Sequence, residues 1–171
     1  MAAIDVVIRP ARTSDIRAIR TLVDAYAPEG RLLSKATVTL YEDVQEFIVA
    51  IDTTQGEAVI GCGAIHVMWE DLAEVRTVAV LPAYRGLGVG SRLLSGLLER
   101  ARDLGVRRVF CLTFETDFFG RHGFEEIAEA PVDPGVYEQL LQSFDEGVAE
   151  FLGLERVKPN TLGNQRMLRV L

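Results

Sequence analysis

Residues 78–90 read VAVLPAYRGLGVG, an apolar strand-like run followed by a proline turn, an arginine and alternate glycines. The glycines at 86, 88 and 90 lack a Cβ atom, so the backbone there can turn tightly and bring several N–H groups close to a phosphate oxygen. A helix that begins directly after such a turn adds the N–H groups of its first turn, which have no acceptor within the helix. The stretch therefore predicts a site for a pyrophosphate group.

The residues after the glycines follow helical periodicity. The spacing predicts a helix over 91–104 that packs on a sheet with one apolar face, formed by Leu93, Leu94, Leu97, Leu98, Ala101 and Leu104. Gly105 ends this helix, and VRRVFCLT at 106–113 predicts the next strand. Together these segments indicate a strand-loop-helix-strand unit with a right-handed crossover.

A dinucleotide site is one alternative for such a unit. It requires G-x-G-x-x-G directly after the strand and an acidic residue near the end of the next strand, where Glu115 is the candidate. The match is poor, because residues 82–85 separate the strand from the glycines and Ser91 stands where the third glycine belongs. The pattern therefore favours another cofactor.

Two motifs carry a resemblance to a known family. Residues 85–90, RGLGVG, satisfy the pattern Q/R-x-x-G-x-G/A, and residues 118–124, FFGRHGF, resemble a second signature in which a short helix ends in x-G-F before a strand. With both motifs in register, the chain resembles the GNAT N-acetyltransferases. The resemblance implies an α/β (α+β) fold with a central mixed, mostly antiparallel sheet flanked by helices.

The remaining periodicity predicts an order of elements that agrees with this fold, within a single domain over residues 1–171. Thr13, Ser14 and Asp15 are expected to cap the first helix, and Pro28-Glu29-Gly30 to end it. Further strands are expected at 6–9, 47–51, 58–68, 74–81 and 165–171, and further helices at 16–26, 36–44 and, after Pro134, across 136–152.

Composition excludes several classes of function. The chain is 49% hydrophobic but has no apolar run of membrane-spanning length and no signal-peptide organisation, which predicts a cytoplasmic protein without a membrane partner. A net charge of −7 argues against nucleic acid as a partner. The two cysteines and two histidines have no metal-ligand spacing, so no metal is expected.

The resemblance implies acetyl-CoA as the co-substrate. Backbone groups of Val78, Ala79 and Val80 are then expected to bind its pantetheine arm. The pyrophosphate would be held by the loop that consists of Arg85, Gly86, Leu87, Gly88, Val89 and Gly90.

A narrower resemblance concerns the acetyl acceptor. Much of the chain, from 31–50 through 61–85 and 109–124 to the tail NQRMLRVL, is similar to the acetyltransferase domain of N-acetylglutamate synthases. The stretch VKPNTLGN at 157–164 resembles the short, stand-alone actinobacterial (mycobacterial-type) form in particular. This implies L-glutamate as the substrate, a product that feeds arginine biosynthesis, and a homodimer.

Glu74 is the candidate general base. It stands six residues before Val80, the spacing at which many members of the family carry this group. Glu74 and Arg76 are two apart on one strand, so their side chains are expected on the same face, together with Val78 and Val80, where the cofactor is expected. Glu74 would accept a proton from the amine, since only a neutral amine attacks a thioester. The alternative is a solvated carboxylate paired with Arg76.

Cations are needed for the two carboxylates of glutamate, and the candidates are Lys35, Arg76 and Arg166. Lys35 falls where the synthases carry a basic residue, and Arg166 matches an arginine of their tail. Met167 and Leu168 replace the next arginine and a serine of that tail, which leaves glutamine open as the acceptor. The alternative for Lys35 and Arg166 is a surface cation.

One departure from the family concerns proton donation. Many members have a tyrosine five residues before the phenylalanine of x-G-F as general acid, but this chain has Phe119. Tyr41 and Tyr137 are conceivable substitutes. Two other functions stay open: acetylation of another small amine or a protein amine, and a non-catalytic acyl-CoA sensor.

Overall fold

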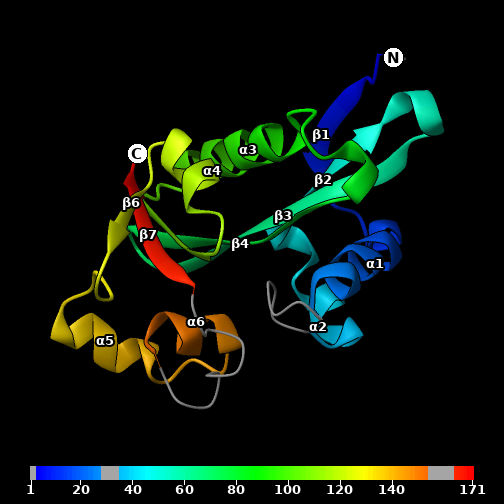
Figure 1. Cartoon of the computed structure of the whole chain (residues 1–171). Helices are drawn as coiled ribbons and strands as arrows, with labels where there is room; N and C mark the ends of the chain where they lie inside the picture. The colour runs from blue at the N-terminus through cyan, green and yellow to red at the C-terminus, as the bar shows by residue number, and fades with distance from the viewer. Residues whose placement is uncertain (1–2, 28–34, 154–163) are drawn as a thin grey trace. The chain divides into compact units, whose positions relative to one another are not determined.

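A computed structural model describes residues 3–27, 35–153 and 164–171 (Figure 1). Its strands are hydrogen-bonded in the order β1-β2-β3-β4-β5-β7-β6. The strands are β1 (Val6–Pro10), β2 (Phe47–Asp52), β3 (Ala58–Trp69), β4 (Leu72–Val80), β5 (Arg108–Thr113), β6 (Glu125–Ile127) and β7 (Gln165–Val170). The α-helices are α1 (Ile16–Tyr26), α2 (Thr37–Glu42), α3 (Val89–Asp103), α4 (Thr116–Arg121), α5 (Pro134–Leu140) and α6 (Glu146–Phe151).

The sheet is mixed, as the sequence predicts. β4 pairs with β5 in parallel, whereas the pairs β1–β2, β2–β3, β5–β7 and β6–β7 are antiparallel. The parallel pair is the one that α3 connects, because a parallel connection needs a long crossover. The predicted order of strands and helices is confirmed.

The chain forms two compact units: a first unit of Met1–His66 with Val75–Arg100, and a second unit of Val67–Glu74 with Ala101–Leu171. β3 and β4 contribute residues to both. The prediction that residues 1–171 form a single domain stays a prediction. Among the described residues, no helix is long and apolar enough to span a membrane.

In the first unit, helices cover the strands on both faces (Figure 1). On one face, the apolar stripe of α1 packs with Leu40 of α2 against β2 and β3. On the other face, α3 approaches the sheet so closely that a Cβ at Gly96 would lie 3.1 Å from Ile48 and 3.2 Å from Ile8. Leu93 and Leu97 of α3 likewise approach Gly61 and Gly63 of β3 so closely that a Cβ there would meet them.

The second unit has its own apolar core beneath α5 and α6. Phe110 of β5 and Phe151 of α6 form an edge-to-face pair with ring centroids 4.4 Å apart. Such pairs contribute about 0.5–1.5 kcal/mol beyond their buried area. The other buried members of this cluster are Met68, Leu72, Leu140, Val148 and Leu152.

The structure corrects several predicted boundaries. α3 begins at Val89, two residues before the predicted start, and the predicted helix over 136–152 is two helices separated by residues 141–145. Asp15 does not cap α1 with its side chain; it accepts hydrogen bonds from the Arg9 side chain (2.7 and 3.0 Å) and the Arg12 N–H (2.7 Å). The predicted end of the first helix at 28–30 lies outside the described residues.

Candidate active site

The glycine-rich loop joins the end of β4 to α3 within the first unit. A short 3₁₀ helix, Pro82–Tyr84, leads into it, and α3 then runs for 15 residues from Val89. Gly86 and Gly88 have φ values of +76° and +80°, a conformation that L side chains rarely adopt, and a Cβ at either would meet no atom of the described residues within 4 Å. The loop therefore borders open space at the start of a helix, which fits a pyrophosphate group.

Tyr84 ties the start of this loop to β2. Its hydroxyl donates to Oδ2 of the buried Asp52 at 2.9 Å, while Asp52 Oδ1 accepts from the Thr54 N–H and hydroxyl at 2.9 and 2.6 Å. Hydrogen bonds from Thr54, and to a smaller extent from Tyr84, hold the pKa of Asp52 below its usual value. The bond to Asp52 in turn raises the pKa of Tyr84, so the phenol keeps its proton at neutral pH.

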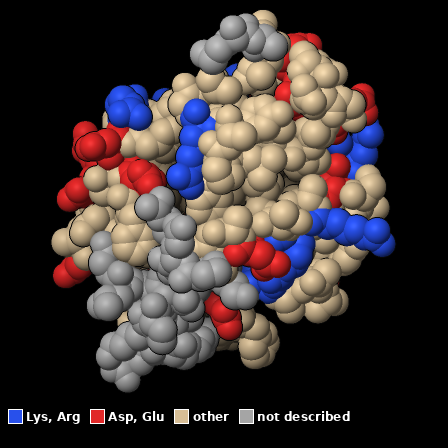
Figure 2. Space-filling model, turned by 45° about the vertical axis from the view of Figure 1, so that its right-hand side comes forward, with Lys and Arg blue, Asp and Glu red and all other residues tan. Residues whose placement is uncertain are grey.

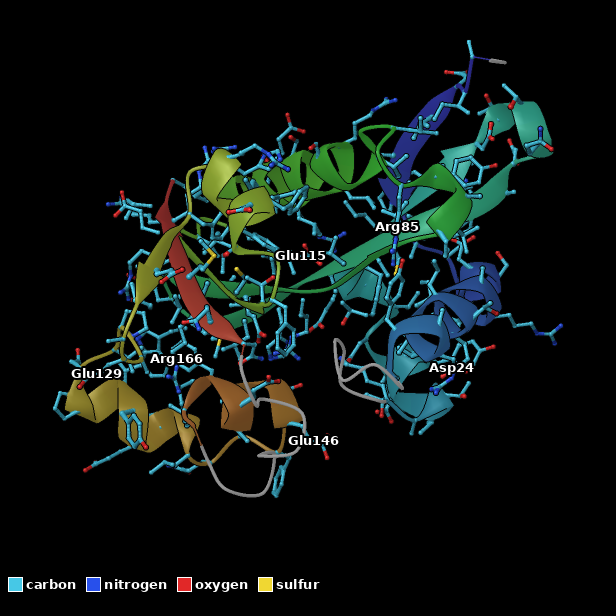
Figure 3. All side chains as sticks on the ribbon, in the orientation of Figure 1. Asp24, Arg85, Glu115, Glu129, Glu146 and Arg166 are labelled. Atoms are coloured by element: carbon cyan, nitrogen blue, oxygen red, sulfur yellow. The ribbon has the colours of Figure 1, made fainter. Side chains whose placement is uncertain are left out.

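Arg85 extends from the loop toward α1, as Figure 3 shows, and contacts Tyr26 there. Its Nη2 and Nε donate to the Tyr26 hydroxyl oxygen at 2.6 and 3.1 Å. That hydroxyl donates in turn to the carbonyl oxygen of Val80 at 2.6 Å. One phenol thus joins the first residue of the loop to the last residue of β4.

The strand residues expected to bind pantetheine also lie in the first unit. Ala79 belongs to the cluster with α1 and α2, whereas the side chains of Val78 and Val80 lie close to Gly63 and Gly61 beneath α3. Thr77, directly before them, has a φ of +57°. A left-handed residue interrupts the alternation of a strand. The expectation that placed Glu74 and Arg76 on the face of Val78 and Val80 assumed an uninterrupted strand, and that assumption is wrong.

Glu74 and Arg76 are both buried, with 4% and 9% of their surfaces exposed. This overturns the alternative of an exposed, solvated pair. Glu74 belongs to the second unit, where it lies opposite Phe110 in the β4–β5 register. Burial raises the pKa of the Cys111 thiol well above its usual value, and the charge of Glu74 raises it further.

Arg166 lies on β7 in the second unit, opposite Leu112 of β5 and Ile127 of β6 (Figure 3). Its Nη1 donates to the carbonyl of Ala128 over 3.4 Å, a long hydrogen bond, and its buried Nε has no hydrogen-bond partner among the residues that the structure describes. A Cβ at Gly153, beyond the end of α6, would lie 3.0 Å from Nη2. An incompletely satisfied guanidinium is a suitable group to bind a carboxylate.

Lys35 lies in the first unit and already has a counter-ion. Its Nζ is 3.7 Å from Oδ2 of Asp43, and 12% of its side chain is exposed. The guanidinium of Arg20 also donates to the Lys35 carbonyl. The interpretation of Lys35 as a surface cation without a partner is therefore wrong, whereas its role toward a substrate stays a prediction.

Phe119 is buried in an aromatic cluster of the second unit. Its ring packs edge-to-face with Phe118 and Phe124, each at 5.2 Å between centroids. The position at which many family members carry a phenol is thus filled by packing alone.

Charge on the surface is dispersed on the face that Figure 2 shows. Blue basic side chains lie singly or in small groups between acidic and uncharged residues there, and they form no continuous basic band.

The sequence analysis missed Tyr26 and Asp52 as groups that hold the loop. Tyr26 falls at the end of the predicted helix over 16–26, and only 8% of its surface is exposed. The available signal was the hydroxyl itself, because a buried phenol needs a hydrogen-bond partner.

Comparison with known proteins identifies relatives over most of the chain. The model of the acetyltransferase (GNAT) family matches residues 16–124. A Mycobacterium tuberculosis protein named amino-acid acetyltransferase is 58% identical over 165 residues, which cover 96% of this chain and 94% of that protein.

Two solved structures are also similar. A crystal structure from Mycobacterium tuberculosis in complex with CoA and NLQ has a TM-score of 0.94 and 57% identity, and the match covers 96% of this chain and 99% of that one. N-acetylglutamate synthase from Neisseria gonorrhoeae, complexed with coenzyme A and N-acetyl-glutamate, has a TM-score of 0.76 at 24% identity, covering 100% of this chain and 36% of that one. The latter is a likeness of fold. These matches confirm the resemblance drawn from the two motifs, and the chain belongs to the acetyltransferase (GNAT) family.

Proposed function

We propose that this protein transfers the acetyl group of acetyl-CoA to the α-amine of L-glutamate. The observation that carries the proposal is the match of 58% identity, over nearly the whole length of both chains, to a protein named amino-acid acetyltransferase. Glutamate as the acceptor rests further on the similarity of residues 164–171 to the tail of N-acetylglutamate synthases. The product would then feed arginine biosynthesis.

Acetyl-CoA is the co-substrate, and the glycine-rich loop is proposed to hold its pyrophosphate. The left-handed glycines Gly86 and Gly88, with open space beside them, support this role. The first turn of α3 would contribute backbone N–H groups from Val89 and Gly90, and its dipole favours an anion. The pantetheine arm would lie along the backbone of residues 78–80.

In the proposed reaction the neutral amine attacks the carbonyl carbon of the thioester. The C–N bond forms, the C–S bond breaks and CoA leaves as a thiolate, without an acyl-enzyme. The thiolate takes up the second proton, which the nitrogen loses as the amide forms. Glu74 would accept the proton that the ammonium must lose, directly or through a water molecule. The Val80 N–H would stabilise the oxyanion of the tetrahedral intermediate. Because a thiol has a pKa of about 8.5, it can leave without a phenol at position 119.

The two carboxylates of glutamate require cations. Arg166 is proposed as one clamp, supported by the long bond of Nη1 and by an Nε without a hydrogen-bond partner in the described part of the chain. Arg76, which is buried, and Lys35, which is paired with Asp43, are proposed to contribute further positive charge. A homodimer is also proposed, from the family resemblance. A cytoplasmic location is proposed as well, as the composition predicts.

The test is the release of thiol from acetyl-CoA with and without L-glutamate. A panel with L-glutamine, other amino acids, small amines and a lysine peptide separates the alternative acceptors. We expect glutamate-dependent release well above the rate with acetyl-CoA alone. Faster release with a different amine would reassign the substrate, and binding of acetyl-CoA without release by any amine would indicate a sensor.

A further inference from the structure

We propose that Tyr26 is a positioning residue of the acetyl-CoA site, which orients Arg85 for the pyrophosphate and fixes the edge of β4 at Val80. This inference rests on the proposed function, because it assumes that the glycine-rich loop holds acetyl-CoA. It assigns to α1 a role in cofactor binding that the family motifs do not contain.

The Tyr26 hydroxyl uses its full capacity to donate and accept hydrogen bonds in this arrangement. A tyrosine hydroxyl has one hydrogen to donate and two lone pairs to accept with. Its hydrogen goes to the Val80 carbonyl at 2.6 Å, and the oxygen accepts from Arg85 Nη2 at 2.6 Å and Nε at 3.1 Å. A phenylalanine would leave the ring in place and remove all three contacts.

The position of the phenol is fixed by its helix. Tyr26 is the last residue of α1, and its ring lies in the apolar cluster with Leu22 and Val23. A ring with two side-chain torsions, held in a packed core, has little freedom to move. Arg85, by contrast, has a long side chain whose orientation would otherwise be spread over many rotamers. The fork of Nε and Nη2 on one oxygen therefore restricts the guanidinium to one direction.

The backbone hydrogen bonds show which edge of β4 the Tyr26 hydroxyl binds. The Leu81 N–H donates to the Ile60 carbonyl on β3 at 2.8 Å. In a trans peptide the Val80 carbonyl points opposite to the Leu81 N–H, hence away from β3. In an extended strand the Val80 N–H lies on the same edge as the Val80 carbonyl. Tyr26 thus binds the strand edge that carries the N–H proposed for the oxyanion.

Binding of CoA, measured by isothermal titration calorimetry, tests the inference without any amine acceptor. We expect Tyr26→Phe to raise the Kd for CoA about tenfold, the scale of one charge-assisted hydrogen bond. The matched control is Thr21→Val, which removes another hydroxyl of α1, one that donates to the Arg17 carbonyl within the helix and contacts neither Arg85 nor Val80. Its Kd should stay within about twofold of wild type, a change well below one hydrogen bond.

Combining Tyr26→Phe with Arg85→Ala provides a readout that a merely structural role would not change. If Tyr26 acts through Arg85, the tenfold effect should shrink to about twofold once Arg85 is alanine. Should Tyr26→Phe fail to fold, Arg85→Lys carries the test, because a lysine keeps the charge but cannot place a fork on the phenol. That variant is also expected to bind CoA about tenfold more weakly.

Three results would overturn the inference: an unchanged Kd in Tyr26→Phe or, in its place, Arg85→Lys; equal weakening by Thr21→Val; or an undiminished effect in the Arg85→Ala background. Failure of the proposed function has a different signature. In that case wild type would bind CoA and show the same pattern of Kd values, but glutamate would not stimulate release of thiol.

Discussion

Glu74 is a buried carboxylate proposed to accept a proton during each turnover. Glu74→Gln keeps the size and polarity of the side chain but removes its basicity. We expect turnover at neutral pH to fall on the order of 10²-fold, the usual scale for a positioned general base, whereas the KM for acetyl-CoA barely changes. Steady-state kinetics between pH 6 and 9 measure both quantities.

Glu125→Gln is the matched control for this residue. Glu125 is an exposed carboxylate on β6, and its replacement should leave turnover unchanged. If Glu74→Gln keeps turnover within twofold of wild type at every pH, the proton goes to water or to another residue.

At the scale of elements, α3 has a left-handed glycine at each end. Gly88 precedes the helix with a φ of +80°, and Gly105 follows it with a φ of +86°; a Cβ at either would meet no atom within 4 Å in the described part of the chain. Gly88→Glu should abolish measurable CoA binding, because a side chain and a negative charge would occupy the space that the phosphates need. Gly105→Glu imposes a similar backbone strain but lies outside the loop, so its Kd for CoA should match wild type.

Calorimetry on both variants, with circular dichroism to verify folding, makes the comparison. Equal loss of CoA binding in the two variants would mean that strain in α3, and not occupation of the loop, is responsible. Retained binding in a folded Gly88→Glu would remove the loop from the cofactor site.

Two arginines of β7 provide a test of the carboxylate clamp: Arg166 is the candidate clamp, and Arg169 is its matched control. Arg169 Nη1 donates to the carbonyl of His122 at 2.6 Å, beyond the end of α4, so its role is structural. Arg166→Ala should raise the KM for glutamate about 10- to 100-fold, since a lost charge-assisted hydrogen bond is worth roughly 1.5–3 kcal/mol. The KM for acetyl-CoA should not change.

Arg169→Ala should lower thermal stability and leave the KM for glutamate as in wild type. An unchanged glutamate KM in Arg166→Ala would contradict the clamp. Equal damage to the KM of both substrates would instead indicate that β7 has lost its structure.

At the scale of the whole molecule, paired carboxylates predict loss of stability in acid. Hydrogen bonds from Arg9 hold the pKa of Asp15 below its usual value of 3.8, and Arg108 acts on Asp71 in the same way. A lowered pKa in the folded state means that the stabilisation is complete above pH about 4 and is lost as pH falls through the lowered values.

Urea unfolding at pH 7, 5, 4 and 3 measures this dependence. At pH 7, Asp15→Asn should cost about 1–3 kcal/mol, because hydrogen bonds to a charged group are lost. The difference between variant and wild type should shrink below pH 4, because the Asp15 carboxyl becomes protonated there in the unfolded chain, and in the folded chain only at still lower pH. A difference that stays constant down to pH 3 would contradict this account.

The order of the elements could be predicted from the sequence because the buried face of a helix or strand repeats apolar residues at a regular, local spacing. The stripe of leucines gave α3, and the apolar run at 106–113 gave β5. By contrast, the left-handed Thr77 has no signature, since positive φ is expected of glycine and only rarely of a β-branched residue. The bond between Arg85 and Tyr26 spans 59 positions in the chain, which no local pattern reports.

In the candidate site, too, some features could be predicted from the sequence and others could not. The glycine loop is contiguous in sequence, so its residues could be predicted and its conformation fits the role. The substrate cations come from separate elements, and their partners, such as Asp43 for Lys35, depend on tertiary structure. The helix over 136–152 was predicted too long because the apolar pattern continues across the break at 141–145.

The two outermost strands of the sheet, β1 and β6, bear on how copies of the chain can associate. β1 ends in Arg9 and Pro10, and a proline offers no N–H to an added strand. β6 has only three residues, and Glu125 and Glu126 are exposed. Two copies joined antiparallel through β6 would bring like charges together across the junction, which is destabilising. Both borders of the sheet thus disfavour the edge-to-edge growth that leads to aggregation, and they favour a homodimer through side-chain surfaces over one through a continued sheet.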